Sequence, residues 1–281
     1  MKYAVSNLAW SPEERLDAYR ILEEAGITGL EIAPGLLFHA AQDPFVPEDA
    51  VAEAALAELA DAGLILVSMQ SLLFGVSGAG LFDGAEAREA LVSGMERAIA
   101  LAGRFDIPNL VFGSPKQRVV PDTMTTADAL SEAVSVFRAL GDVAAQAGTK
   151  IAIESNPALY GTNFLTTLED AHAFVERVDH SAIVSILDLG AMHINGTYTT
   201  VPDRIPEIIK HLNHVHVSEP NLAPAPDCSE ALVPVLQALQ ASNYEHAVSI
   251  EMARPSSGLA DVKRAVDRLV AAINSVERTH A

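Results

Sequence analysis

The chain has 281 residues, of which 49% are hydrophobic and 20% charged, and its formal net charge at pH 7 is −19. This length suits a single (β/α)8 barrel of about 250 residues, and the composition supports a large core rather than a disordered chain. Nucleic-acid binding and anionic-membrane binding both depend on clustered Lys and Arg, so the acidic balance argues against both kinds of partner.

Short apolar segments alternate with longer amphipathic segments along the chain. Several of the short ones are almost wholly apolar, which is typical of parallel strands covered by helices on the sheet's faces. The predicted strands span residues 2–7, 29–33, 64–69, 109–113, 150–154, 183–188, 212–217 and 247–251.

The segments between these strands favour helices. In 258–276 the apolar residues recur at spacings of three and four. The segments 11–14 and 125–128 carry helix-capping signals. The predicted helices span residues 12–25, 84–103, 124–147, 166–178, 229–242 and 258–276.

Strict alternation of strand and helix predicts an α/β fold with a parallel sheet. Eight such units in 281 residues predict a (β/α)8 TIM barrel, with residues 1–281 forming a single domain. An open doubly wound sheet is the alternative, but no Gly-x-Gly-x-x-Gly follows the first strand.

Candidate reactive groups stand where the predicted strands end, as they do in barrel enzymes. Glu154, Asp188, His216 and Glu251 each end one of four consecutive buried strands. Three carboxylates converging on one mouth would repel each other, and a divalent cation would relieve that repulsion. The alternative is that each acid is a helix N-cap or a loop charge. Strand periodicity places His214 one layer deeper, as a core or supporting residue.

Carboxylate and imidazole ligands suit Mn²⁺, our favoured ion, and also Mg²⁺, Co²⁺ and Zn²⁺. A structural zinc site is disfavoured because no cysteine belongs to the set. The one cysteine of the chain, Cys228, excludes an intrachain disulfide. With no apolar signal core in residues 1–7 and no membrane-length apolar run, we expect a cytoplasmic protein.

At three of these strand ends, the longer motifs are Glu154-Ser-Asn-Pro, Asp188-Leu-Gly-Ala-Met-His-Ile-Asn-Gly and His214-Val-His-Val-Ser-Glu-Pro-Asn. With them the chain resembles the xylose isomerase-like TIM barrel superfamily, in its sugar phosphate isomerase/epimerase group, which includes ketose 3-epimerases, inosose dehydratases and endonuclease IV. The resemblance implies that Glu154, Asp188, His216 and Glu251 bind the metal and that Glu154 and Glu251 also exchange a substrate proton. It further implies a homodimer or homotetramer.

The chain departs from these relatives at several positions. Ketose 3-epimerases have a sugar-binding His three residues after the metal Asp, where this chain has Ala191, and an Arg in the loop that here reads Glu219-Pro-Asn-Leu. Endonuclease IV needs further His ligands on strands that here end at Glu31, Gln70 and Ser114. The departures put free ketohexose specificity in question and oppose a DNA-repair function.

Further polar residues around the predicted mouth are candidates for binding a small carbohydrate. The cationic ones could hold a phosphate or carboxylate of the substrate, or could balance the local acids. The candidates are Gln70, Lys116, Arg118, Asn156, Tyr160, His193, Glu219 and Arg254.

Together these features predict a metal-dependent isomerase or epimerase acting on a sugar, sugar phosphate or polyol ketone by proton transfer through an enediolate. A lyase or dehydratase that uses the same enolate, such as one cleaving 3-keto-glycosides, is the alternative enzyme. A barrel that binds metal and sugar without turnover is the alternative outside catalysis.

Overall fold

The structure of the protein is a computed structural model that describes residues 1–280. Its eight parallel strands form a closed barrel in chain order, from β1 to β8. The predicted (β/α)8 TIM barrel is thereby confirmed, and each strand lies within one residue of its predicted bounds. The strands are β1 (Lys2–Ser6), β2 (Gly29–Ile32), β3 (Ile65–Met69), β4 (Asn109–Phe112), β5 (Lys150–Ile153), β6 (Ile183–Asp188), β7 (Leu212–Val217) and β8 (Ala247–Ile250).

Helices separate the strands, and all six predicted ones are present. In α5 the Thr125 side chain accepts a hydrogen bond from the Asp128 N–H, as its capping signal predicts. The helices are α1 (Arg15–Glu24), α2 (Pro34–Leu37), α3 (Asp49–Asp61), α4 (Ala85–Arg104), α5 (Thr126–Gln146), α6 (Leu168–Val178), α7 (Leu189–Ile194), α8 (Val201–Ile208), α9 (Ser229–Ala241) and α10 (Leu259–His280), together with six short 3-10 turns, η1 (Asn7–Ala9), η2 (Pro12–Glu14), η3 (Pro115–Arg118), η4 (Ala158–Tyr160), η5 (Tyr198–Thr200) and η6 (Pro220–Leu222).

Four helices were not predicted, and their sequences explain why. Helix α8 contains Pro206, a residue that removes one intrahelical hydrogen bond and argues against a helix. The buried face of α3 consists largely of Ala52, Ala55 and Leu59, so its apolar stripe is weak. Helices α2 and α7 are only four and six residues long. Their packing, rather than their pattern, makes them helical.

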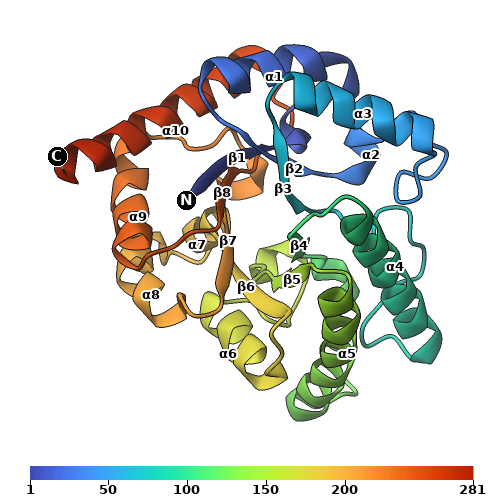
Figure 1. Ribbon diagram of the computed structural model, residues 1–281. Coiled ribbons are helices and arrows are strands. Elements are labelled where there is room, and N and C mark those ends of the chain that lie inside the picture. The colour runs from blue at the N-terminus through green and yellow to red at the C-terminus, as the bar shows by residue number, and fades with distance from the viewer. Residues whose placement is uncertain (281) are drawn as a thin grey trace. The chain divides into compact units, whose positions relative to one another are not determined.

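The described chain divides into two compact units, the first formed by residues 1–67 with 188–280 and the second by residues 68–187. In the first unit β1 pairs with β2 and β8, and β7 pairs with β8. A side chain at Gly29 would collide with Tyr3 O and Ala4 Cβ, so the close approach of β2 to β1 requires glycine. Helices α8, α9 and α10 lie outside β7 and β8 in this unit (Figure 1).

In the second unit β5 pairs with β4 on one side and β6 on the other, with Ile153 opposite Ser185. Val111, Ala152, Val184 and Ile186 from these strands form one buried cluster. Helices α4, α5 and α6 lie side by side outside them (Figure 1). The pairing brings the carboxyl ends of β4, β5 and β6 to the same edge of this unit.

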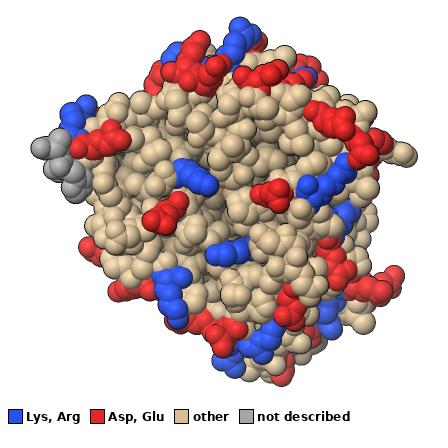
Figure 2. Space-filling model, viewed as in Figure 1, with Lys and Arg blue, Asp and Glu red and all other residues tan. Residues whose placement is uncertain are grey.

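Acidic side chains are interspersed with basic ones on the face shown in Figure 2, rather than being separated from them. Because the two signs of charge are mixed, this face offers no continuous basic surface of the kind that nucleic-acid backbones require.

No helix in residues 1–280 combines the length and apolar character that a membrane span needs.

Candidate metal centre

Three of the predicted ligands meet in the first unit. Asp188 ends β6, His216 lies near the end of β7, and Glu251 directly follows β8. His216 Nδ1 lies 3.6 Å from Asp188 Oδ2 and 3.3 Å from Glu251 Oε2. The imidazole is fully buried, whereas Asp188 and Glu251 remain 8% and 7% exposed. Two carboxylates thus face one ring nitrogen at a position that keeps slight contact with solvent.

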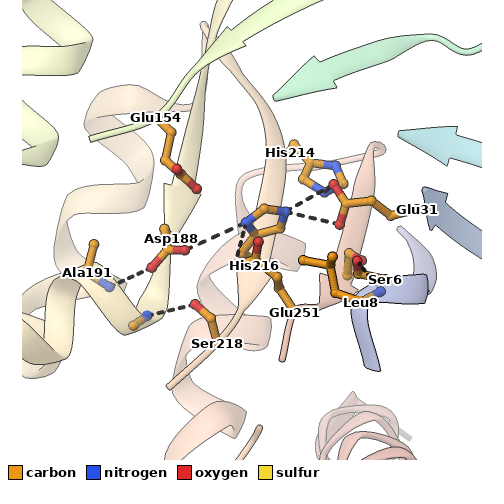
Figure 3. A network of polar contacts seen from close by, with 12 residues as sticks. Ser6, Leu8, Glu31, Glu154, Asp188, Ala191, His214, His216, Ser218 and Glu251 are labelled. Carbon is orange, nitrogen blue, oxygen red and sulfur yellow. Dashed lines mark hydrogen bonds and ion pairs between the residues drawn. The ribbon is translucent and has the colours of Figure 1, made fainter. Parts of the chain in front are cut away.

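The opposite side of the His216 ring is held by a fourth buried residue, Glu31, at the third position of β2. Glu31 Oε1 and Oε2 lie 3.1 and 3.0 Å from His216 Nε2 (Figure 3). A carboxylate only accepts, so His216 Nε2 carries a proton and donates it to Glu31, while Nδ1 faces Asp188 and Glu251. This is the arrangement in which a carboxylate orients a metal-binding histidine.

Glu31 also contacts His214, one layer deeper on β7, with Oε1 3.3 Å from His214 Nε2. Burial acts to raise the pKa of Glu31, but the charges and hydrogen bonds of His216 and His214 outweigh it, and the pKa lies well below its usual value. Glu31 is therefore an anion inside the barrel. His214 occupies the supporting position predicted from strand periodicity.

Asp188 carries out two tasks with its two oxygens. Oδ1 accepts a hydrogen bond of 2.5 Å from the Ala191 N–H and caps α7, while Oδ2 faces His216. The next residues are fixed as well, because the Gly190 N–H donates to Ser218 Oγ at 2.8 Å. The N-cap alternative and the ligand prediction for Asp188 are thus compatible, since each uses a different oxygen.

The first-unit cluster fits a divalent cation. One potential ligand atom from each of Asp188, His216 and Glu251 lies within 4.8 Å of the others. Donors on opposite sides of one ion with bonds of about 2.1 Å are about 4.2 Å apart. Two carboxylates and one imidazole are ligands suited to Mn²⁺, Mg²⁺, Co²⁺ or Zn²⁺. The protein therefore offers carboxylate and histidine groups able to bind a metal.

The fourth predicted ligand, Glu154, follows β5 in the second unit and is 8% exposed. Its Oε2 accepts a hydrogen bond of 2.8 Å from Asn156 Nδ2, and Asn156 Oδ1 accepts one of 2.7 Å from Arg118 Nη2. Gly113, after β4, leaves room for the same Oε2, because an added Cβ there would collide with it. The predicted site residues Glu154, Asn156 and Arg118 thus form one connected set.

The remaining substrate-binding candidates of the second unit differ in environment. Gln70 follows β3 and is 6% exposed, whereas Lys116, in η3, is exposed. Tyr160 closes η4 and is half-buried. Only Gln70 among these three is enclosed by the fold.

His193 and Glu219 come together in the first unit. Their His193 Nε2 and Glu219 Oε2 atoms lie 3.7 Å apart, and the His193 ring stacks on Tyr198 with centroids separated by 3.9 Å. Both line a small cavity of about 100 Å³ beside Leu189 and Ser218. The two candidates therefore share one small pocket, whose lining also includes Leu189 and Val217, the residues that follow Asp188 and His216 in the chain.

Arg254, the last candidate, is engaged elsewhere. Its guanidinium donates to both oxygens of Glu14 at 2.7 and 2.9 Å. This contact lowers the pKa of Glu14 to about 2. In this structure Arg254 links the loop after β8 to η2.

One supporting residue, Glu31, was recognised from sequence only as a strand end. A glutamate between Leu30 and Ile32 in a wholly buried strand was the available signal. Its role depends on contact with His216 of β7, which lies far away in the chain. Spacing along the sequence could not reveal that contact.

Comparison with protein families gives a single decisive match. The family described as "Xylose isomerase-like TIM barrel" matches residues 19–272, which is most of the chain. The protein belongs to this family. The resemblance predicted from the strand-end motifs is confirmed. Among curated proteins, none matches this xylose isomerase-like barrel.

Solved structures similar to this xylose isomerase-like barrel include several sugar epimerases. A D-psicose 3-epimerase with D-tagatose from Clostridium cellulolyticum H10 has a TM-score of 0.75 at 17% identity, with 99% of each chain covered. A 3-keto-D-glucoside 4-epimerase from E. coli has a TM-score of 0.72 at 20% identity, over 98% of this chain and 99% of that one. A D-tagatose 3-epimerase-like protein has a TM-score of 0.77 at 17% identity, with both chains fully covered. At these identities the likeness establishes the fold.

Proposed function

We propose that the protein is a divalent-metal-dependent isomerase or epimerase that acts on a sugar, a sugar phosphate or a related polyol ketone. The observation that carries the proposal is the pair of carboxylates, Asp188 and Glu251, facing the Nδ1 atom of a histidine that Glu31 holds from behind. Membership of the xylose isomerase-like family and the epimerases among the similar structures support it.

Glu154 is proposed as the fourth ligand, with Mn²⁺ as the favoured ion. It follows β5, which pairs in register with β6, and β6 ends at Asp188. In a closed parallel barrel, neighbouring strand ends lie at the same mouth. The proposal treats the 281-residue chain as one domain, since the barrel takes strands from both units.

The proposed reaction moves a proton on a carbon next to a carbonyl group. A bound divalent ion would supply Lewis-acid stabilisation of negative charge on the substrate oxygens. Glu154 and Glu251 are proposed as the base that removes the proton and the acid that returns it, from opposite faces in an epimerisation. Asp188 and His216 take no part in the proton transfer in this scheme, because Asp188 Oδ1 accepts from the Ala191 N–H and His216 Nε2 donates its proton to Glu31.

The test is hydrogen exchange in D₂O with a panel of ketoses, keto-inositols and sugar phosphates, followed by mass spectrometry of the sugar. The wild-type protein with Mn²⁺ should incorporate deuterium into at least one member. Glu154→Gln and Glu251→Gln should each lower that rate by about 10²- to 10⁴-fold. Glu245→Gln, at an exposed carboxylate before β8, is the matched control.

Undiminished exchange in both Gln variants would contradict the paired carboxylates. Loss of exchange in Glu245→Gln as well would point to a general effect of charge removal. NMR analysis of the products then separates an epimer from a dehydrated or cleaved product, and so separates this function from a lyase.

A further inference from the structure

Arg118, at the end of η3, is among the largest fully buried side chains of the second unit, at 0% exposure. Its Nη2 donates to Asn156 Oδ1 at 2.7 Å, while Nε and Nη1 are buried with no hydrogen-bond partner in the described part of the chain. Burying a guanidinium with two nitrogens unsatisfied costs free energy. A native structure that retains such a group has a reason for keeping it.

The charge of this buried group is maintained. Burial lowers the pKa of Arg118 to about 10, and the charge of Glu154 acts in the opposite direction. Arg118 therefore remains a cation near neutral pH. It is a positive charge without solvent contact beside the proposed base Glu154.

Asn156 links Arg118 to Glu154, and its side-chain amide can do so in only one of its two orientations. A guanidinium can only donate, so the amide must present its oxygen to Arg118. Its NH₂ group then points to Glu154 Oε2, 2.8 Å away. An amide turned by 180° would place two donors together at Arg118 and two acceptors together at Glu154. Arg118 thus determines which end of Asn156 faces the carboxylate.

The surroundings of Glu154 strengthen this constraint. Its Oε2 accepts from Asn156 Nδ2 and lies so close to Gly113 that a Cβ there would force the carboxylate to move. The Glu154 N–H donates to Phe112 O at 3.1 Å and continues the β4–β5 pairing. Backbone and one carboxylate oxygen are therefore both anchored.

We propose that Arg118 is a positioning residue, which holds the Glu154 carboxylate through Asn156 in the orientation that metal binding and proton transfer require. Arg118 does not contact the substrate in this proposal, in contrast to its prediction from sequence. The inference rests on the proposed function for the role of Glu154, but its geometric part stands on the second unit alone.

The geometric part is tested by crystal structures of the metal-free Arg118→Met and Arg118→Lys proteins. In Arg118→Met the Asn156 amide and the Glu154 carboxylate should shift from their wild-type positions. In Arg118→Lys the ammonium group can still donate to Asn156, so both should be retained. Gln117→Met changes the preceding residue of the same turn and is the matched control. An unmoved Glu154 in Arg118→Met overturns the proposal.

The functional part is tested by calorimetric titration with Mn²⁺ alone. Arg118→Met and Asn156→Ala should bind Mn²⁺ about 10- to 100-fold more weakly, because losing a residue that orients a metal ligand typically weakens metal binding by that factor. Arg118→Lys should recover part of the loss, and Gln117→Met should match wild type. Asn156→Ala breaks the same chain of hydrogen bonds and leaves Arg118 itself in place, so it serves if Arg118→Met fails to fold.

A substrate-binding role for Arg118 gives a different result. Wild-type Mn²⁺ affinity in Arg118→Met and Asn156→Ala, with a raised KM and unchanged kcat in the exchange reaction, overturns the positioning role. A wild-type protein that binds no Mn²⁺ contradicts the proposed function instead, and the crystal structures alone then decide whether Arg118 orients Glu154.

Discussion

Glu31 and His216 are 185 residues apart in the chain, yet Glu31 Oε2 lies 3.0 Å from His216 Nε2 in the barrel interior. The contact fixes the ring orientation and directs Nδ1 to Asp188 and Glu251 (Figure 3). The negative charge of Glu31 also makes the imidazole more basic and so a stronger metal ligand. Metal binding at this site should therefore depend on a residue that is not itself one of the four proposed ligands.

Glu31→Gln is expected to weaken Mn²⁺ binding by about 10- to 100-fold, because the side chain keeps its shape but loses the charge that orients His216. Isothermal titration calorimetry measures the affinity directly. Glu58→Gln, which removes a carboxylate paired with Arg15 on the helical layer, is the control and should leave the affinity unchanged. Equal affinity of Glu31→Gln and wild type would show that Glu31 does not support the site.

Asp188→Asn and Asp188→Ala should separate the two tasks of Asp188. Asparagine caps helices about as well as aspartate, whereas alanine removes the cap and costs about 1 kcal/mol. Urea unfolding without metal should therefore show a loss of stability for Asp188→Ala but little for Asp188→Asn. Both variants should lose Mn²⁺ affinity in calorimetry. Retained affinity in Asp188→Asn would mean that Oδ2 is not a ligand.

Gly113→Ala is expected to disturb Glu154 without changing the fold. The new Cβ would occupy the space of Glu154 Oε2, and the end of that side chain would have to move. Weaker Mn²⁺ binding should follow, with a circular dichroism spectrum like that of wild type. Gly103→Ala, on the outer helix α4, is a comparison for the general effect of adding a methyl group. Unchanged Mn²⁺ affinity in Gly113→Ala would argue against Glu154 as a ligand.

Arg254→Met should raise the pKa of Glu14 from about 2 towards the ordinary value of about 4.3. A carboxyl group whose folded-state pKa is depressed stabilises the protein above its unfolded pKa and loses that contribution as the pH falls through the folded value. The variant should thus be slightly less stable than wild type near pH 6, since Arg254 is half-exposed and solvent screens the pair, and the difference should shrink between about pH 4 and pH 2.

NMR titration of the Glu14 side chain, combined with urea unfolding at pH 6 and pH 3, measures both quantities. Unchanged titration of Glu14 in Arg254→Met would mean that the guanidinium does not hold this carboxylate in solution. Arg254 would then be available to a substrate, as predicted from sequence.

The eight strands could be predicted closely because each is a short apolar run between polar segments, and burial on both faces leaves that pattern in the sequence. Helices with a broad apolar stripe, such as α5 and α10, were equally visible. Helix α8 was not predicted, because Pro206 argues against a helix in a segment that its packing keeps helical. Local pattern determines elements only where local preference and tertiary packing agree.

For the site, the sequence by itself determined which residue types stand at the strand ends, since a metal-capable side chain after a buried strand is a local feature. Only the tertiary structure decided how they are oriented. It placed Glu31 behind His216, directed one Asp188 oxygen to the Ala191 N–H and the other to His216, and buried Arg118 against Asn156. These contacts join residues on different strands and loops, and their geometry depends on strand register and side-chain packing that no spacing along the chain records.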